Sequence, residues 1–392
     1  MKRMLSWIVL GVFLLSCGIM FPSSGAANNP ITIDMSSGTT PLPTPPPIRL
    51  SAITATNVDR IEAIYSWHVS DTVRTEDLLA ISPDKKWVAL TPRDGAPLHI
   101  QRLKWTPDGA FVPMGNGFSS FYLYQTAAVA FSPDSMHVAV ANGADNSVLV
   151  FGLDDLPSEA KKQLLPIGDR PEAVAFTGDS QKLLIGTMAG ANGSLQLRDL
   201  GTSSLESNIP AQALGEICSV AVSPDGKILA ASSCGEPFTI STWDIDAGYR
   251  PLTHLAKSDQ AGPCGAYACP GLRNVFAFNP ASGEIASGFD FPRIAIHDPR
   301  TGKLTTSVTA SAARESSSSG ESISALAYTS DGSALVMLAN QELQLIDAKR
   351  GNLLWHLQDP RPTTAVAISA DSRLMVSLTG GGDLIFFGVP TQ

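Results

Sequence analysis

Short runs of β-prone residues, separated by polar turns, recur along the chain from about residue 51 to its end. One stretch shows the pattern clearly, with apolar or alternating runs at 217–223, 228–232, 238–244 and 249–254. Runs of four to eight residues at this spacing favour strands over helices. The pattern therefore predicts an all-β protein.

One of these runs repeats seven times, in forms such as LLAISPD, AVAFSPD and SVAVSPD. The third residue is always alanine, at spacings of 40 to 56 residues: Ala80, Ala130, Ala175, Ala221, Ala277, Ala327 and Ala367. Four short strands in a period of forty-odd residues are typical of a propeller blade. The repeat predicts a seven-bladed β-propeller over residues 51–392. The aspartate that ends six copies is interpreted as a turn residue, because an active site is not repeated six times.

The last repeat is one strand short. It supplies runs at 363–369, 374–378 and 383–389, and then the chain ends. A β-prone segment at 58–67 precedes the first repeat and is predicted to be the missing outer strand. Without it the last blade would expose an unpaired edge, which is a template for aggregation.

Several third strands end in related motifs: Thr242-Trp243-Asp244-Ile245, Leu197-Arg198-Asp199-Leu200 and Ile296-His297-Asp298. With the SPDG-like turns, they make residues 51–392 resemble the WD40-repeat family, and the stretch 146–175 resembles the YVTN class of bacterial surface propellers. The resemblance implies a propeller closed by an N-terminal strand. The chain departs from the family because the Gly-His dipeptide is missing and a Trp-Asp pair occurs once. The family's buried Asp-His-Ser-Trp network is therefore mostly absent, and Asp145 is the best-placed relic of its aspartate.

The N-terminus reads as an export signal. Lys2 and Arg3 precede a short apolar run that ends at Ser16. The residues around Cys17 resemble a bacterial lipobox, so residues 1–20 are interpreted as a lipoprotein-type signal peptide with lipid on Cys17. Conventional cleavage after Ala27 remains the alternative. Residues 21–50 are rich in Pro, Ser and Thr and are interpreted as a linker with a reach of roughly 30 Å. We expect an exported protein, either tethered to a membrane and facing the periplasm or cell exterior, or secreted.

Charge argues about the class of partner, and the cysteine count argues about disulfides. The net charge is −9 and the sequence contains no basic stripe, which argues against a nucleic-acid partner. Without Cys17, four cysteines remain, an even number for an oxidising compartment. We predict disulfides between Cys264 and Cys269 and between Cys218 and Cys234. A link from Cys218 or Cys234 to the 264–269 loop is the alternative, and a metal site is disfavoured because no CxxC pair occurs.

Loops after the second and fourth strand of each blade should gather on one face of the propeller. This face receives the cysteine loop 258–272, the serine-rich 311–322 and glycine-containing turns. Binding residues often lie on such loops. We expect the partner-binding rim to contain the residues just before the inner strands: Glu76, Gln125, Arg170, Glu216, Arg273, Glu321 and Arg361. Its three arginines could bind a carboxylate or phosphate, or they could be ordinary paired surface charges.

Catalytic signatures such as GxSxG, HExxH and the P-loop are absent from the sequence. The histidines stand singly: His68, His99, His137, His254, His297 and His356. We predict no cofactor and no metal, and interpret the chain as a non-catalytic scaffold that engages a protein or cell-envelope ligand. The alternative is a lactonase-like hydrolase in which acids such as Asp145, Glu236 and Asp290 hold a divalent cation in the central channel.

Overall fold

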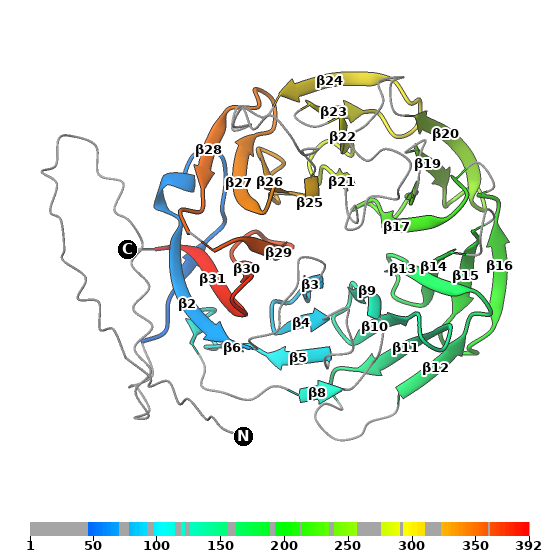
Figure 1. Ribbon diagram of the computed structural model, residues 1–392, viewed down its shortest axis with the longest axis horizontal. Coiled ribbons are helices and arrows are strands. Elements are labelled where there is room, and N and C mark those ends of the chain that lie inside the picture. The colour runs from blue at the N-terminus through cyan, green and yellow to red at the C-terminus, as the bar shows by residue number, and fades with distance from the viewer. Residues whose placement is uncertain are drawn as a thin grey trace, which may run out of the picture. The chain divides into compact units, whose positions relative to one another are not determined.

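The computed structural model describes residues 46–69, 78–91, 98–113, 119–121, 126–154, 162–188, 193–211, 214–234, 239–256, 276–290, 293–309, 323–359 and 361–391. All of them belong to one compact unit. Their strands form seven small antiparallel sheets around a common centre (Figure 1). The predicted all-β, seven-bladed propeller is confirmed. Within these ranges, no helix is long and apolar enough to cross a membrane.

The first four blades each contain four strands in chain order, from the centre outwards. Blade one holds β3 (Leu78–Ile81), β4 (Trp87–Thr91), β5 (Leu98–Arg102) and β8 (Ser119–Phe121). Blade two holds β9 (Thr126–Phe131), β10 (His137–Asn142), β11 (Ser147–Gly152) and β12 (Lys162–Pro166). Blade three holds β13 (Arg170–Phe176), β14 (Lys182–Met188), β15 (Leu195–Asp199) and β16 (Leu205–Ile209). Blade four holds β17 (Ile217–Val222), β18 (Ile228–Ser233), β19 (Thr239–Asp244) and β20 (Arg250–Ala256).

The remaining blades follow the same order until the chain ends. Blade five holds β21 (Phe276–Phe278), β22 (Ile285–Asp290), β23 (Arg293–His297) and β24 (Leu304–Thr309). Blade six holds β25 (Ile323–Tyr328), β26 (Ala334–Ala339), β27 (Glu342–Asp347) and β28 (Leu353–His356). Blade seven holds β29 (Thr363–Ile368), β30 (Met375–Thr379) and β31 (Asp383–Pro390), and its outer strand comes from the N-terminal side of the propeller.

That outer strand is β2 (Glu62–His68), which we call the latch strand. It pairs antiparallel with β31, from Glu62 opposite Gly388 to His68 opposite Asp383. Figure 1 shows the blue β2 beside the red β31. The predicted ring closure is confirmed, although the first residues of the predicted segment form a short 3₁₀ helix, η1 (Val58–Arg60). β1 (Leu50–Ser51) also pairs with β31, next to its C-terminal end.

A small hairpin between the third and fourth strands of blade one was not predicted. It consists of β6 (Lys104–Trp105) and β7 (Phe111–Val112). The backbones of Phe111 and Ile48 exchange two hydrogen bonds of 2.7 Å. The ring of Phe111 also lies 5.9 Å from that of Phe386 in β31 and 6.4 Å from that of Tyr65 in the latch strand. The hairpin therefore fastens the segment before the latch strand to both blade one and blade seven.

The predicted turn role of the repeated aspartates agrees with their hydrogen bonds. In blade four, Ser223 Oγ donates to Asp225 Oδ1 over 2.5 Å, and Oδ1 also accepts the backbone N–H of Lys227. The same Ser223 Oγ accepts the N–H of Ile228 at the start of β18. The pattern recurs at five other copies: Asp84, Asp134, Asp179, Asp331 and Asp371. In blade five, Asn279 caps the turn by accepting the N–H groups of Ala281 and Ser282.

These bonds make a pH-dependent contribution to stability. The hydrogen bond from Ser223 holds the pKa of Asp225 below its ordinary value. A lowered pKa stabilises the fold while the carboxylate is ionised, and this contribution is lost as pH falls from about 4 through the lower folded pKa. We expect Ser223→Ala to cost about 1 to 3 kcal/mol at pH 7, with a smaller difference from wild type near pH 3. Urea unfolding at both pH values measures this, and an equal difference at both would contradict it.

Candidate functional site

The connections between strands divide the propeller into two faces. The turn face carries the aspartate turns and the connections from third to fourth strands. The loop face carries the connections after the second and fourth strands, where the predicted rim residues lie. Of these, the structure describes Arg170, Glu216 and Arg361. The other four rim residues lie outside the described residues: Glu76, Gln125, Arg273 and Glu321.

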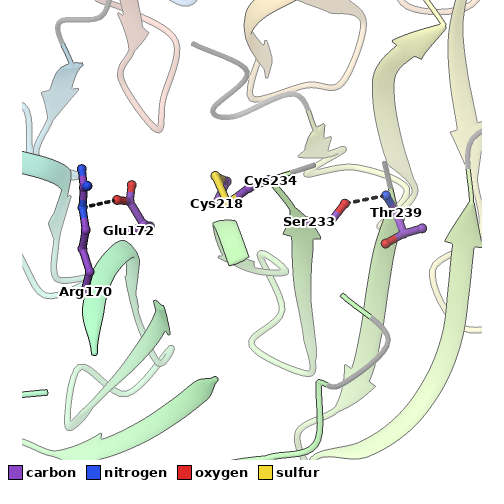
Figure 2. Close-up of a disulfide and its surroundings, with 6 residues drawn as sticks. All are labelled: Arg170, Glu172, Cys218, Ser233, Cys234 and Thr239. Carbon is purple, nitrogen blue, oxygen red and sulfur yellow. Dashed lines mark hydrogen bonds and ion pairs between the residues drawn. A yellow bond between two sulfur atoms is a disulfide. The ribbon is translucent and has the colours of Figure 1, made fainter. Parts of the chain in front are cut away.

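A cavity of about 60 Å³ lies among the inner strands of blades one to four. Its lining includes aliphatic residues such as Leu79, Val129 and Val174. Glu172 is the one ionisable side chain among the described residues that line it, and its carboxyl group is only 1% exposed. Arg170 Nε lies 2.8 Å from Glu172 Oε1, while the arginine side chain is 47% exposed (Figure 2). The sequence pattern predicted Arg170 as a site residue but gave no prediction for Glu172.

Glu172 owes its place to a β-bulge. The register between β13 and β14 shifts between Pro171 and Ala173, so that Glu172 is skipped. Glu172 stands three positions before the repeated alanine of its blade. Four other inner strands have a register shift at this same position of the repeat. The residues skipped there are Ala127, Cys218, Ser324 and Thr364. Bulges change the direction of a side chain relative to the sheet and are frequent next to binding sites. The five bulges mark the loop-face end of the inner strands as the candidate functional site.

A disulfide joins Cys218 and Cys234 at this end of blade four (Figure 2). This is the pairing expected from the sequence, and Cys218 also lines the cavity. The backbone N–H of Cys234 donates to Glu216 O over 2.9 Å, so the bridge holds the end of β18 against the start of β17. Cys264, Cys269 and Cys17 lie outside the described residues, and their predicted disulfide and lipid stay predictions.

The bridge should matter to stability because it closes a loop with a sequence separation of 16 residues. Closing a loop of this length lowers the conformational entropy of the unfolded chain and so raises its free energy by about 3 kcal/mol. We expect the Cys218→Ala, Cys234→Ala double variant to lose roughly 2 to 4 kcal/mol of unfolding free energy. Urea unfolding with and without reductant checks this, since reductant should lower the wild type to the level of the variant. A wild type that is insensitive to reductant and as stable as the variant would contradict it.

Arg361, the second described rim arginine, belongs to a cluster beside the latch strand. Its guanidinium contacts Asp359 through Nε and Nη2, at 3.0 and 2.8 Å, and Asp383 through Nη1. Asp383 Oδ1 lies 2.8 Å from His68 Nδ1. Burial raises the pKa of Asp359, but hydrogen bonds from Arg361 outweigh it and leave that pKa lowered. Arg170 and Arg361 thus already pair with carboxylates of the chain, and this agrees with the interpretation of paired rim charges.

Of the three acids suggested for a channel metal site, the structure describes the side chain of Asp145 alone. Asp145 is exposed and accepts a hydrogen bond from Ser147 Oγ. Glu236 and the side chain of Asp290 lie outside the described residues. In the described part of the chain, no three His, Cys, Asp or Glu side chains form a group that could hold a metal ion.

Comparison with known families agrees with this architecture. A family model described as "WD domain, G-beta repeat" matches residues 205–244. The matched stretch begins at β16, the outer strand of blade three, and ends with β19, the third strand of blade four. It closes on Trp243 and Asp244, and the buried Trp243 donates its indole N–H to Pro210 O. No curated protein matches the chain. The match and the seven blades support a WD40-type propeller, a kind of domain that suits non-catalytic binding and commonly takes protein partners.

Proposed function

We propose that this protein is a non-catalytic binding or scaffold propeller, exported from the cytoplasm, whose loop face engages a protein or cell-envelope ligand. The observation that carries the proposal is the difference between the two faces. The turn face is bonded together and partly covered by the chain itself. At the loop-face end of the described inner strands lie the bulges, the disulfide and residues that line the cavity.

Neighbouring turns on the turn face bond to one another. The N–H of Asp84 donates to Ser135 Oγ over 3.0 Å, which joins blades one and two. Asp134 and Ser180 join blades two and three in the same way, at 3.1 Å. Ser372 Oγ accepts the N–H of Ser330 over 2.7 Å between blades six and seven. Backbone groups engaged in this way are not available to a partner.

The N-terminal segment of the propeller also lies on the turn face. Ile53 donates its N–H to Ser372 O in the turn of blade seven, and Ala55 donates to Ser333 Oγ in the turn of blade six. Arg49 pairs with Asp108 in the hairpin of blade one. The linker therefore joins the propeller on the turn face. A lipid on Cys17 would therefore tether the propeller to a membrane through a linker that enters on this face.

The lipid anchor is testable in cells. One acyl chain gives only marginal membrane binding, so stable attachment of the mature protein needs the full lipid on the new N-terminal cysteine. We expect Cys17→Ser to move most of the protein from the membrane pellet to the soluble fraction. Immunoblotting after fractionation measures this, with Cys218→Ala as a cysteine variant that should stay in the pellet. A Cys17→Ser protein that stays with the membranes would show that another anchor exists.

Site-specific photocrosslinking tests the proposed binding face even while the partner is unidentified. A photoreactive residue is placed at Asp145 or Glu216 on the loop face, and at Lys86 or Met136 on the turn face. Lys86 and Met136 are more than half exposed, so they are fair controls. We expect discrete adducts in native cells from the loop-face positions only. The same adducts from both faces, or adducts from the turn face alone, would overturn the proposal.

A further inference from the structure

The bulge of the inner strand does not require a carboxylate at position 172. The other described bulges of the inner strands hold small uncharged side chains or the disulfide: Ala127, Cys218, Ser324 and Thr364. Blade two forms the same bulge with alanine alone. A buried ionised carboxylate costs several kcal/mol of desolvation, so an uncharged residue would suit the fold at least as well. Glu172 therefore calls for an explanation beyond folding.

Arg170 and Glu172 differ in their exposure to solvent. The Glu172 side chain is 1% exposed and lines the cavity, whereas Arg170 is 47% exposed at the start of β13. A half-exposed arginine loses little when water or another group replaces its contact. The buried carboxylate, in contrast, needs a cation next to it. Another cation that reaches Glu172 could therefore take the place of Arg170.

The size of the cavity limits what could enter. A water molecule needs roughly 10 to 15 Å³ of such space, so the cavity of about 60 Å³ has room for about four to six atoms of this size. A guanidinium group has four non-hydrogen atoms, and the end of a lysine side chain has fewer. Whole small-molecule ligands occupy roughly 300 to 1,000 Å³. The space fits the end of one side chain.

We propose that the cavity receives the cationic end of an arginine or lysine side chain from a protein partner, with Glu172 as its counter-ion. Arg170 occupies the carboxylate in the free protein and swings out to solvent when the partner's side chain enters. A carboxylate binds a guanidinium by two parallel hydrogen bonds, which gives direction as well as attraction. The disulfide at Cys218 keeps this wall of the cavity fixed. This inference rests on the proposed function and identifies the chemistry of the partner.

Calorimetric titration of the full-length protein with capped arginine, N-acetyl-arginine methylamide, tests the inference. We expect weak binding to wild type, and no binding of the neutral isostere N-acetyl-citrulline methylamide. Glu172→Gln and Glu172→Ala should each abolish binding without lowering the melting temperature. Arg170→Gln should bind capped arginine at least tenfold more tightly, because it removes an internal competitor for the carboxylate. Glu206→Gln changes an exposed glutamate on the outer strand of the same blade, outside the cavity lining; it is the matched control and should bind as wild type does.

Unchanged binding by the Glu172 variants, or equal binding of arginine and citrulline, would overturn the inference. So would an Arg170→Gln variant that folds but binds no more tightly than wild type, or a wild type that binds neither compound. A Glu172→Ala variant that unfolds would assign the carboxylate a structural role instead. Failure here is distinguishable from failure of the proposed function, because loop-face crosslinks to a partner could persist without a cationic side chain in the cavity.

Discussion

Deletion of residues 57–68, which contain the latch strand, is expected to yield an aggregating product instead of a soluble monomer. The deletion leaves the outer edge of β31 without the partner that β2 provides from Glu62 to His68. Unpaired edges of this length recruit strands from other molecules. It also uncovers Phe386, whose ring lies 5.6 Å from that of Tyr65 in the latch strand. Size-exclusion chromatography and light scattering of the refolded protein measure the outcome.

Point variants on the latch strand separate packing from pairing. Tyr65→Ala removes a partly buried ring from the aromatic cluster and should lower the melting temperature by several degrees. Glu62→Ala changes an exposed side chain on the same strand and should leave melting unchanged. A soluble monomer with unaltered melting after deletion of 57–68 would mean that the latch strand does not close the ring.

Asp383→Asn is expected to produce the second large loss of stability. Asp383 is 3% exposed and lies between His68 of the latch strand and Arg361. The amide keeps the size of the side chain but removes its charge, so its contacts with both partners weaken. Hydrogen bonds to charged groups contribute about 1.5 to 3 kcal/mol each, and we expect a loss of this order. Urea unfolding at pH 7 measures it.

The ion pair between Arg49 and Asp108 provides a matched control. Both side chains are more than half exposed. Exposed ion pairs contribute little to stability because solvent and salt screen them, so Asp108→Asn should be close to neutral. If Asp383→Asn were as mild as Asp108→Asn, the cluster of His68, Asp383, Arg361 and Asp359 would not fasten the latch strand to blade seven.

The fold could be predicted from the sequence because the same strand-and-turn motif recurs in every blade. Seven alanines and six turn aspartates occupy the same positions of the repeat and predict seven blades. Because the last repeat lacks a strand, the β-prone segment before the first repeat is the candidate that completes it. The hairpin β6–β7 was not predicted because no other blade has such an insertion among the residues that the structure describes. Its turn, Thr106-Pro107-Asp108-Gly109, is nevertheless another SPDG-like turn, and Thr106 Oγ1 accepts the N–H of Ala110. That similarity to the repeated turns could have predicted the hairpin.

The candidate site was only partly predictable, for physical reasons. Whether Glu172 faces the cavity depends on a bulge, and a shift of one residue moves a side chain to the other face of a strand. Its sequence signal is a single carboxylate directly before the apolar run of an inner strand. The cluster at Asp383 joins residues 68 and 361, which only ring closure brings together. The disulfide, in contrast, joins two cysteines of one blade, close enough in sequence to be paired from the strand pattern.

Hydrogen–deuterium exchange of the full-length protein, with and without the partner identified by crosslinking, tests the central claim most directly. We expect slower exchange on binding in the loop-face segments 167–172, 214–218 and 380–383. The turn-face segments 84–87, 134–137 and 225–228 should exchange as in the free protein. Protection confined to the turn-face segments, with the loop-face segments unchanged, would contradict the assignment of the loop face as the binding surface.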